Sequence, residues 1–461
     1  MSSEHSLEQK KAERALLWKV DLILMPILTI TLGLQYYDKA VLGSASIFGI
    51  IADLHLSQVI GGKAVTTRYS TATAAFYWGY LIAVLPVALL FARLPLAKSA
   101  AVAVFFWGVV CILTVVVTSY QGLVVQRVFL GLLESAVSPA FVAVTCLWYK
   151  PSEQTTRLGI WYSATGVRSA TIAWSVVIWF LLPNSPQDPG RFFNAAEREI
   201  LLARFAENPY GKEKLPFKRD QAIEAVLDVK TWIYLLLAVA IYMCNGAVTA
   251  FGGIIVKSFG YTSLQSIAHQ IPGGAFTCIT IYLFAYPCNK FKNIRTFMLP
   301  LSCIPVIVGA LVIWLASWHP RAGPLFGYFF VATFGAPYVI LLALASANVI
   351  GSTKKAITTG AIFIGYNVGN ITAAYLVFAD EKAIKYRSTW IALIVCMAFT
   401  IVTAFVLRYM YSAENKRRNT ALAAQTHVDL STDEKLGDPE IIDQVYVDLT
   451  DKQRKEFRYS L

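Results

Sequence analysis

Charged residues are scarce in this chain. Of its 461 residues, 15% are Asp, Glu, Lys or Arg, whereas soluble domains carry about 25%. Hydrophobic residues make up 56%, and the mean hydropathy is +0.55. This composition excludes an ordinary soluble domain. A net charge of +12 would suggest nucleic-acid binding in a soluble protein, but in so apolar a chain it indicates basic loops beside membrane spans, so we expect no nucleic-acid partner.

Several kinds of site also have no signature. The sequence contains no Walker phosphate loop, which disfavours ATP-driven transport, and no two histidines have metal-ligand spacing. The seven cysteines lie in or beside apolar runs without a C-x-x-C pair, so we expect them to pack as small apolar residues. We therefore expect no enzymatic activity, no cofactor and no metal site.

Long apolar runs, by contrast, recur from Leu22 to Met410. A run of about 18 or more apolar residues is long enough to cross a bilayer as a helix. Spans are predicted at 22–44, 70–92, 98–118, 122–149, 157–182, 231–256, 267–288, 295–317, 324–347, 357–379 and 388–411. The chain is therefore predicted to be an all-α polytopic membrane protein surrounded by lipid.

The hydrophilic segments divide the chain into regions. Residues 1–20 form a polar tail without the apolar centre of a signal peptide. Two membrane halves, 21–182 and 231–411, are joined by a central loop, 183–230, in which AAEREILLARFAE is a predicted helix. The tail 412–461 changes from basic to acidic and is predicted to be disordered. Basic loops place both termini and the central loop in the cytosol.

The count of eleven spans conflicts with that orientation. Five spans would put the central loop outside, whereas the charges of the second half require it inside. Arg168 lies near the middle of the fifth predicted span, where an unpaired charge costs at least about 2.5–3.5 kcal/mol. Arg168 is either a functional arginine facing a polar cavity or part of a junction between two incomplete spans. The junction would restore twelve spans in two halves of six.

Four strings, in this order and spacing, resemble the major facilitator superfamily. More closely, they resemble the fungal allantoate/nicotinate permease branch of the anion:cation symporter family. The strings are KVDLILMPILTITLGLQYYDKAVLGSA, QRVFLGLLESAVSPAFVAVTCLWYKPSEQTTRLGIWYSATG, NGAVTAFGGIIVKSFGYTSLQS and SANVIGSTKKAITTGAIFIGYNVGNI. The resemblance covers about 16–411 and implies the major facilitator fold of two helical halves. About 11 spans are visible where 12 are expected, and a stretch on the order of 35 residues is missing near Arg168.

The resemblance also implies a function. We expect secondary active import of a small organic anion, an allantoate-, nicotinate- or vitamin-like carboxylate, coupled to protons. We further expect a monomer in the plasma membrane. Three alternatives stay open: an exporter of a secondary metabolite, a non-transporting receptor, and a degenerate permease without activity.

Ionisable residues inside spans are costly and are therefore functional candidates. Asp38 and Lys39 lie in the first span, and Arg127 and Glu134 lie in the fourth. The spacing of seven puts Arg127 and Glu134 on one stripe of a helix, about 10 Å apart along its axis. A cation can bind a substrate carboxylate, and a buried acid can carry a proton because burial disfavours its charged form.

The resemblance assigns proton coupling to Asp38 and Glu134 and substrate binding to Lys39 and Arg127. Lys39 stands where many family members have Arg, so it would bind as a point charge without the bidentate fork. The alternative for Arg127 and Glu134 is an ion-pair network that fixes the helices in one conformation.

The string GYNVGN supplies further candidates. Gly365 and Gly369 form a G-x-x-x-G step that permits close helix packing. Asn367 is either polar glue between helices or a direct hydrogen-bonding partner of the substrate. Tyr37 is a candidate for the cavity wall, and Asn245 is a weaker one.

Overall fold

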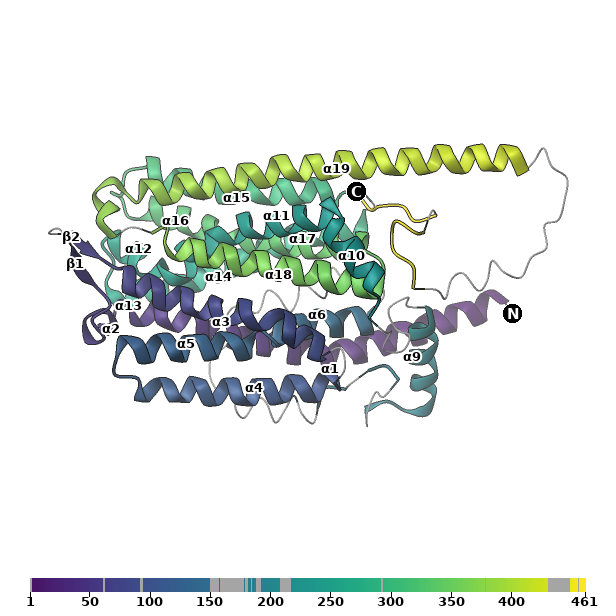
Figure 1. Cartoon of the computed structure of the whole chain (residues 1–461), viewed down its shortest axis with the longest axis horizontal. Helices are drawn as coiled ribbons and strands as arrows, with labels where there is room; N and C mark the ends of the chain where they lie inside the picture. The colour runs from purple at the N-terminus through teal and green to yellow at the C-terminus, as the bar shows by residue number, and fades with distance from the viewer. Residues whose placement is uncertain are drawn as a thin grey trace.

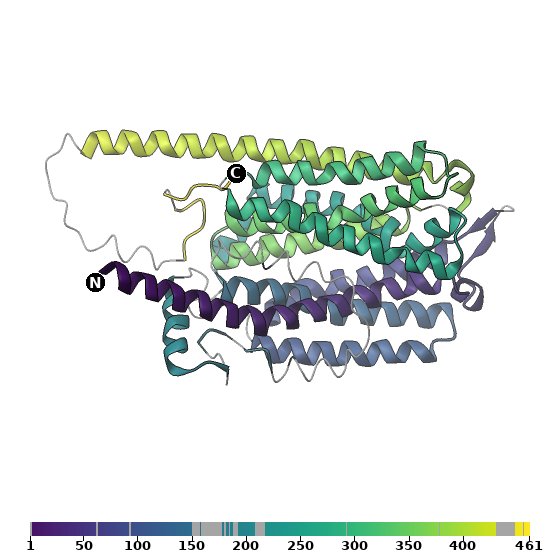
Figure 2. The ribbon, with the colours of Figure 1, turned by 180° about the vertical axis from the view of Figure 1, so that it is seen from behind.

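Long helices run roughly along the longest axis of the molecule (Figure 1). The computed structural model describes residues 2–429 and 448–461, apart from 61–62, 92–93, 150–156, 158–177, 179–180, 184, 188–191, 208–216, 292, 378 and 455. Both termini lie near one end of the bundle, called here the terminal end. A small β-hairpin marks the opposite end, called the hairpin end (Figure 2).

The first half is built from helices that match four predicted spans. They are α1 (Ser2–Ala45), α3 (Thr67–Phe91), α4 (Leu96–Leu113) with a 3-10 turn η1 (Thr114–Val116), and α5 (Tyr120–Glu134) continued by α6 (Val137–Trp148). A short α2 (Ile50–Asp53) precedes the hairpin. Most of the predicted fifth span, including Arg168, lies outside the described residues.

The second half has helices at the positions of all six predicted spans. They are α11 (Val229–Asn245) with the π-helix η3 (Gly246–Ala250) and α12 (Gly252–Ser258); α13 (Ser263–Ala268) with α14 (Gln270–Lys290); α15 (Arg295–Leu315); α16 (Ala322–Val331), η4 (Ala332–Phe334) and α17 (Gly335–Asn348); α18 (Ser352–Ala374); and α19 (Arg387–Asp429), which follows η5 (Ala379–Ile384). Eight of the described helices are long and apolar enough to cross a membrane.

The central loop and the C-terminal tail lie outside the predicted spans. The predicted helix of the central loop is present as α9 (Ala195–Glu207), and a second helix, α10 (Arg219–Leu227), follows it. The prediction that 412–461 is disordered is wrong for two parts of it. Helix α19 continues to Asp429, supported by the ion pair between Glu414 and Arg418 at the favourable i,i+4 spacing. Residues 448–461 lie against the terminal end of the second half.

The hairpin is a local exception to the all-α class. Strands β1 (Gln58–Ile60) and β2 (Lys63–Val65) pair antiparallel, with Gln58 opposite Val65. They connect α2 to α3 and precede the predicted second span, 70–92. Helix periodicity could not predict this hairpin, because each strand is only three residues long.

The two halves contact each other toward the hairpin end. Tyr69 on α3 donates a hydrogen bond of 2.6 Å to the carbonyl oxygen of Ala250 on η3. A Cβ atom placed on Gly43 of α1 would lie 2.4 Å from the carbonyl oxygen of Thr249. Gly43 therefore allows the backbones of α1 and η3 to touch, and larger residues would force them apart.

Helix α18 packs closely on α11 within the second half. A Cβ atom on Gly365 would lie 2.3 Å from the Leu235 carbonyl oxygen, and one on Gly369 would lie 2.6 Å from that of Val239. The two glycines therefore let the helix backbones approach more closely than any side chain would permit. This packing fixes the side of α18 that faces the first half.

Candidate functional site

One face of α1 forms a wall of a cavity of about 560 Å³ between the two halves. Its lining residues on α1 include Leu32, Gln35, Tyr36 and Lys39. Their spacing of three and four places them on one side of a helix. The volume lies in the range of sites for small organic molecules, about 300–1,000 Å³.

The second half supplies most of the remaining wall. Both aromatic and polar side chains line this part of the wall. They include Tyr242, Asn245, Thr249, Gln270, Tyr328, Phe363 and Tyr366. Such a lining can surround an apolar or planar body while a few polar groups fix its orientation.

Lys39 is the cation of this cavity. Its Nζ lies 3.4 Å from Glu134 Oε2 and donates a hydrogen bond of 3.3 Å to the hydroxyl of Tyr366. The ammonium also lies 5.2 Å from the ring centre of Phe76 and 5.7 Å from that of Tyr80. Aromatic faces attract a cation without neutralising it, so the charge of Lys39 remains available to an anion.

Glu134 is fully buried at the end of α5. Its carboxylate oxygens have no hydrogen-bond donor among the described residues, and only its backbone oxygen accepts a bond, of 3.1 Å, from Gln35. The long contact with Lys39 is thus the ion pair that the described structure gives this carboxylate. A buried charge so weakly compensated is costly, which favours a change of partner or of protonation.

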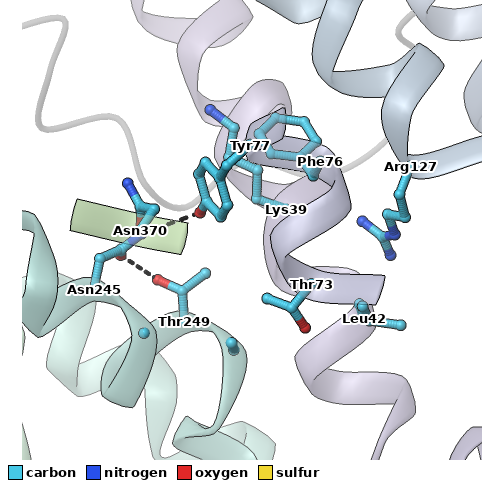
Figure 3. A pocket seen from close by; sticks show the side chains of 11 residues that line it. Lys39, Leu42, Thr73, Phe76, Tyr77, Arg127, Asn245, Thr249 and Asn370 are labelled. Atoms are coloured by element: carbon cyan, nitrogen blue, oxygen red, sulfur yellow. Dashed lines mark hydrogen bonds between the residues drawn. The ribbon is translucent and has the colours of Figure 1, made fainter. Parts of the chain in front are cut away.

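Arg127 lies to one side of Lys39 and lines a second, much smaller cavity of about 20 Å³ (Figure 3). Its side chain is 4% exposed, and Nη1 donates a hydrogen bond of 3.4 Å to the backbone oxygen of Asp38. Nε has no partner among the described residues. The space beside the guanidinium holds about one water molecule, so Arg127 does not line the large cavity in this conformation.

Asp38 faces a different direction from Lys39, its neighbour in the sequence. Its Oδ2 accepts a hydrogen bond of 3.1 Å from Cys111 Sγ on α4. Asp38 lines neither cavity. Consecutive side chains on a helix point about 100° apart, and here Lys39 lies on the cavity side of α1 while Asp38 lies on the side next to α4.

A chain of hydrogen bonds joins the halves next to Lys39. Asn245 donates to Asn370 at 2.6 Å and to the hydroxyl of Tyr77 at 3.4 Å, and it accepts from Thr249. Thr249 in turn lies 3.0 Å from the hydroxyl of Tyr36. Asn245, Thr249 and Asn370 line the smaller cavity on the side opposite Arg127 (Figure 3). The chain includes the junction of α11 with the π-helix, and such bulges are frequent at functional sites.

The structure thus brings together Lys39, Glu134 and Arg127 of the predicted residues. Asn245, the weaker candidate, lines both cavities. Asn367 lies apart: it is fully buried, donates a hydrogen bond of 2.7 Å to Phe363 of its own helix, and lines neither cavity. The side chain of Tyr37 lies outside the described part.

Several residues of the wall were not among the candidates predicted from the sequence. Tyr36 and Gln35 stand three and four residues before Lys39, so helical spacing from the lysine was a usable signal. Tyr366 and Asn370 stand beside the predicted Asn367, but only the packing of α18 on α11 decides which of them face the cavities. No local signal indicated Gln270 or Tyr328.

Comparisons with known proteins agree with this architecture. The family model described as Major Facilitator Superfamily matches residues 28–174. An uncharacterised transporter of Schizosaccharomyces pombe is 32% identical over 479 aligned positions, covering 97% of this chain and 88% of its own. This alignment is longer than the whole chain, so the relative carries residues that have no counterpart here.

Two further similarities concern a named permease and a solved structure. The allantoate permease of Saccharomyces cerevisiae is 28% identical, covering 97% of this chain and 87% of its own. The proton:xylose symporter XylE has a TM-score of 0.61 at 13% identity, over 83% of this chain and 94% of its own, which shows the fold alone. The expected resemblance is confirmed. The chain belongs to the major facilitator superfamily and is a multi-pass membrane transporter of a small molecule, not an enzyme.

Proposed function

We propose that this transporter imports a small organic anion together with a proton. The observation that carries the proposal is the position of Lys39. Its ammonium faces the 560 Å³ cavity and contacts a buried Glu134 carboxylate that has no hydrogen-bond donor among the described residues.

The coupling follows from competition for one cation. An ionised Glu134 holds Lys39 and opposes binding of a second carboxylate. Protonation of Glu134 removes its negative charge, and Lys39 then becomes available to the carboxylate of a substrate in the cavity. Proton and anion therefore favour each other's binding, and by linkage each raises the affinity for the other by the same factor.

The cavity wall supports a monocarboxylate with a polar or planar body. Lys39 supplies one positive charge, and the rings of Tyr36, Tyr242 and Tyr328 supply flat surfaces. Asn245 and Gln270 supply amide groups that can donate and accept hydrogen bonds. Allantoate, which one relative is named for, and nicotinate both have this chemistry.

The other predicted ionisable residues receive secondary roles. Arg127 is proposed as a second anion-attracting cation that a substrate reaches only when the halves move apart. Asp38 is proposed as a second proton site, separated from the cavity by its orientation toward Cys111. Asn367 stays a proposed substrate contact for another conformation of α18.

We further propose that the terminal end faces the cytosol in the plasma membrane, that the carrier works as a monomer and that its complete form has twelve spans. In this orientation the contacts of Gly43 and Tyr69 close the cavity toward the outside. The twelve-span form is supported by relatives that align over more positions than this chain has residues.

The substitution Glu134→Gln tests the coupling. We expect accumulation of labelled allantoate or nicotinate driven by an inward proton gradient to be lost. Exchange of internal for external substrate, which needs no net proton movement, is expected to persist, because the amide leaves Lys39 free. Both are measured in reconstituted vesicles. The control is Glu199→Gln, which removes the same charge from an exposed position.

Other results would contradict the proposal in distinguishable ways. Gradient-driven accumulation by the Glu134→Gln variant would show that Glu134 is not part of the coupling mechanism. Net movement by the unaltered protein only toward the outside would favour the exporter. Absence of both exchange and accumulation with the unaltered protein would favour the degenerate permease.

A further inference from the structure

A short segment after α19 returns to the bundle. Residues 448–461, called here the C-terminal segment, lie beside the terminal end of the second half (Figure 1). They contact residues of α10, α11, α15, α17, α18 and α19. This segment is separated from the large cavity and takes no part in the proposed transport cycle.

Asp451 is the most deeply buried acid of the segment, with no exposed surface. Its two carboxylate oxygens lie 2.6 Å from Lys230 Nζ and 2.6 Å from Lys354 Nζ. The hydroxyl of Tyr459 donates a third bond, of 2.6 Å. Charge-assisted hydrogen bonds of this length are roughly twice as strong as neutral ones.

Asp448 contacts the first residues of α18. Helix α18 begins after Gly351, which has no side chain to cap it. Asp448 accepts hydrogen bonds of 2.8 Å from the backbone nitrogen and 2.7 Å from the hydroxyl of Ser352, and one of 3.1 Å from Gln221. A carboxylate at this position satisfies a free N–H group and interacts favourably with the helix dipole.

Two asparagines bind the backbone of the segment. Asn348, at the end of α17, accepts from the backbone nitrogen of Ser460 at 2.7 Å and donates to its carbonyl oxygen at 2.9 Å. Asn415 on α19 makes the same pair of bonds with Tyr459, both of 2.8 Å. The ring of Tyr459 also stacks on Tyr411 at 4.8 Å. Paired amide bonds to main-chain groups are a means of recognising an extended peptide.

A metal ion is not needed to explain this acidic cluster. Glu224, Asp228 and Asp451 each offer an oxygen within 4.8 Å of the others. Lys354 Nζ lies 2.8 Å from Glu224, 2.8 Å from Asp228 and 2.6 Å from Asp451. The ammonium group therefore already provides the positive charge that a cation would supply.

We propose that the surface formed by the terminal ends of α10, α11, α18 and α19 is a peptide-binding site, and that its ligand is the chain's own C-terminal segment. Asp448 and Asp451 supply the charged contacts, and Tyr459 supplies the aromatic one. Binding ties the terminal ends of the second half into one rigid unit. The charged contacts of Asp448 and Asp451 and the paired amide bonds to the backbone are expected to hold the segment even without the covalent connection through 430–447.

The test separates binding from covalent attachment in the full-length protein. A cleavage site for a specific protease is introduced within 430–447, and the purified carrier is cleaved and washed. We expect the C-terminal segment to remain with the bundle. Asp451→Asn is expected to weaken retention about tenfold or more, because hydrogen bonds to charged groups contribute about 1.5–3 kcal/mol. The matched control Glu456→Gln removes one negative charge from an exposed position of the same segment and is expected to change nothing.

A second measurement uses a carrier altered only by the cleavage site. Its own segment is cleaved and removed at high salt, and labelled synthetic peptides with the sequence of 448–461, either native or with Asn for Asp451, are then added at low salt. Selective rebinding of the native peptide is the expected result. Immediate release of the native segment on cleavage, or equal behaviour of the two peptides, would overturn the proposal. Because no substrate is involved, either result is independent of the proposed transport function.

Discussion

Two groups of buried charges in this protein differ in how completely they are compensated. At the central site, Lys39 and Glu134 are 3.4 Å apart, and the carboxylate has no hydrogen-bond donor among the described residues. At the terminal end, Lys354 makes three contacts of 2.6–2.8 Å with carboxylates. The first group can exchange partners at little cost, whereas the second would lose several strong contacts at once.

This difference indicates separate roles for chemically similar residues. An ammonium that must release a carboxylate and bind another in each cycle should hold neither strongly. An ammonium that joins three segments should have every one of its N–H groups bound to an acceptor. Burial of a lysine beside an acid is therefore not sufficient evidence for transport or for structural support, and the number and length of the contacts discriminate between them.

The largest expected effect distinguishes the two lysines. Lys39→Gln should lower uptake about 100-fold or more, because removing one partner of a buried charged contact costs roughly 2–5 kcal/mol. Its effect on folding should be small, since Glu134 can then take up a proton. Lys354→Gln should instead destabilise the fold by about 3–5 kcal/mol, because it leaves several buried carboxylates near one another. Uptake and thermal unfolding of both variants provide the comparison.

The exposed Lys452 supplies the control. Its Nζ lies 3.8 Å from Asp228, and its side chain is 49% exposed. Lys452→Gln removes the same charge from the same cluster and should change stability by about 1 kcal/mol at most. Equal unfolding temperatures for the Lys39 and Lys354 variants would contradict the distinction between the two groups.

A smaller effect is expected from a change that alters only the movement of the halves. Gly43→Ala places a methyl group against the Thr249 carbonyl oxygen and should disfavour closure at the hairpin end. Overpacking costs about 1–3 kcal/mol, which shifts a two-state equilibrium by about 5–150-fold. Uptake and exchange should both slow, while the C-terminal segment stays bound.

Gly323 serves as the control, because the nearest atom to a Cβ added there is 4.0 Å away. Gly323→Ala should therefore leave the rate unchanged. If Gly43→Ala transported as fast as Gly323→Ala, the contact between α1 and η3 would not be part of the cycle.

The smallest expected effect is that of pH on the stability that Asp451 contributes at the terminal end. Burial raises the pKa of Asp451, but the ammonium groups of Lys230 and Lys354 outweigh burial and hold this pKa below its ordinary value. A carboxyl with a lowered pKa adds stability that is complete above its ordinary pKa, about 4, and is lost only as the pH falls through the lowered value.

The contribution of Asp451 should therefore stay constant between about pH 7.5 and about pH 5, well above the ordinary pKa of an aspartate. The measurement is the difference in unfolding temperature between the unaltered protein and Asp451→Asn at both values. Glu224 and Asp228 each offer an oxygen within 4.8 Å of Asp451, and the groups that contact its carboxylate are Lys230, Lys354 and Tyr459. A difference that shrinks markedly at the lower pH would mean that these groups do not hold the carboxylate in its charged form.

Much of the fold could be predicted from apolar runs alone. Described helices lie at ten of the predicted spans, and eight of these positions have the apolar length that a bilayer requires of a spanning helix. The continuation of α19 and the docking of 448–461 were not predictable in the same way. Their partners are single side chains such as Asn348 and Lys354, about a hundred residues away in the sequence.

The site could be predicted in part. Lys39, Arg127 and Glu134 stood out because a charge within a span is costly. Sequence could not separate the roles of Asp38 and Lys39, since both are ionisable and adjacent. Helical spacing from Lys39 would have favoured Tyr36 over Tyr37 for the same face, but only the position of the second half shows which face is enclosed.

The amino-acid sequence by itself determined the membrane class, the approximate spans and the few charges that membrane burial makes significant. These follow from the cost of placing polar groups in hydrocarbon, which depends on each segment alone. The tertiary structure decided which of those charges meet, how far apart they lie and which acids are left without donors. These properties depend on how α1, α5 and α18 pack against one another, and no single segment contains that information.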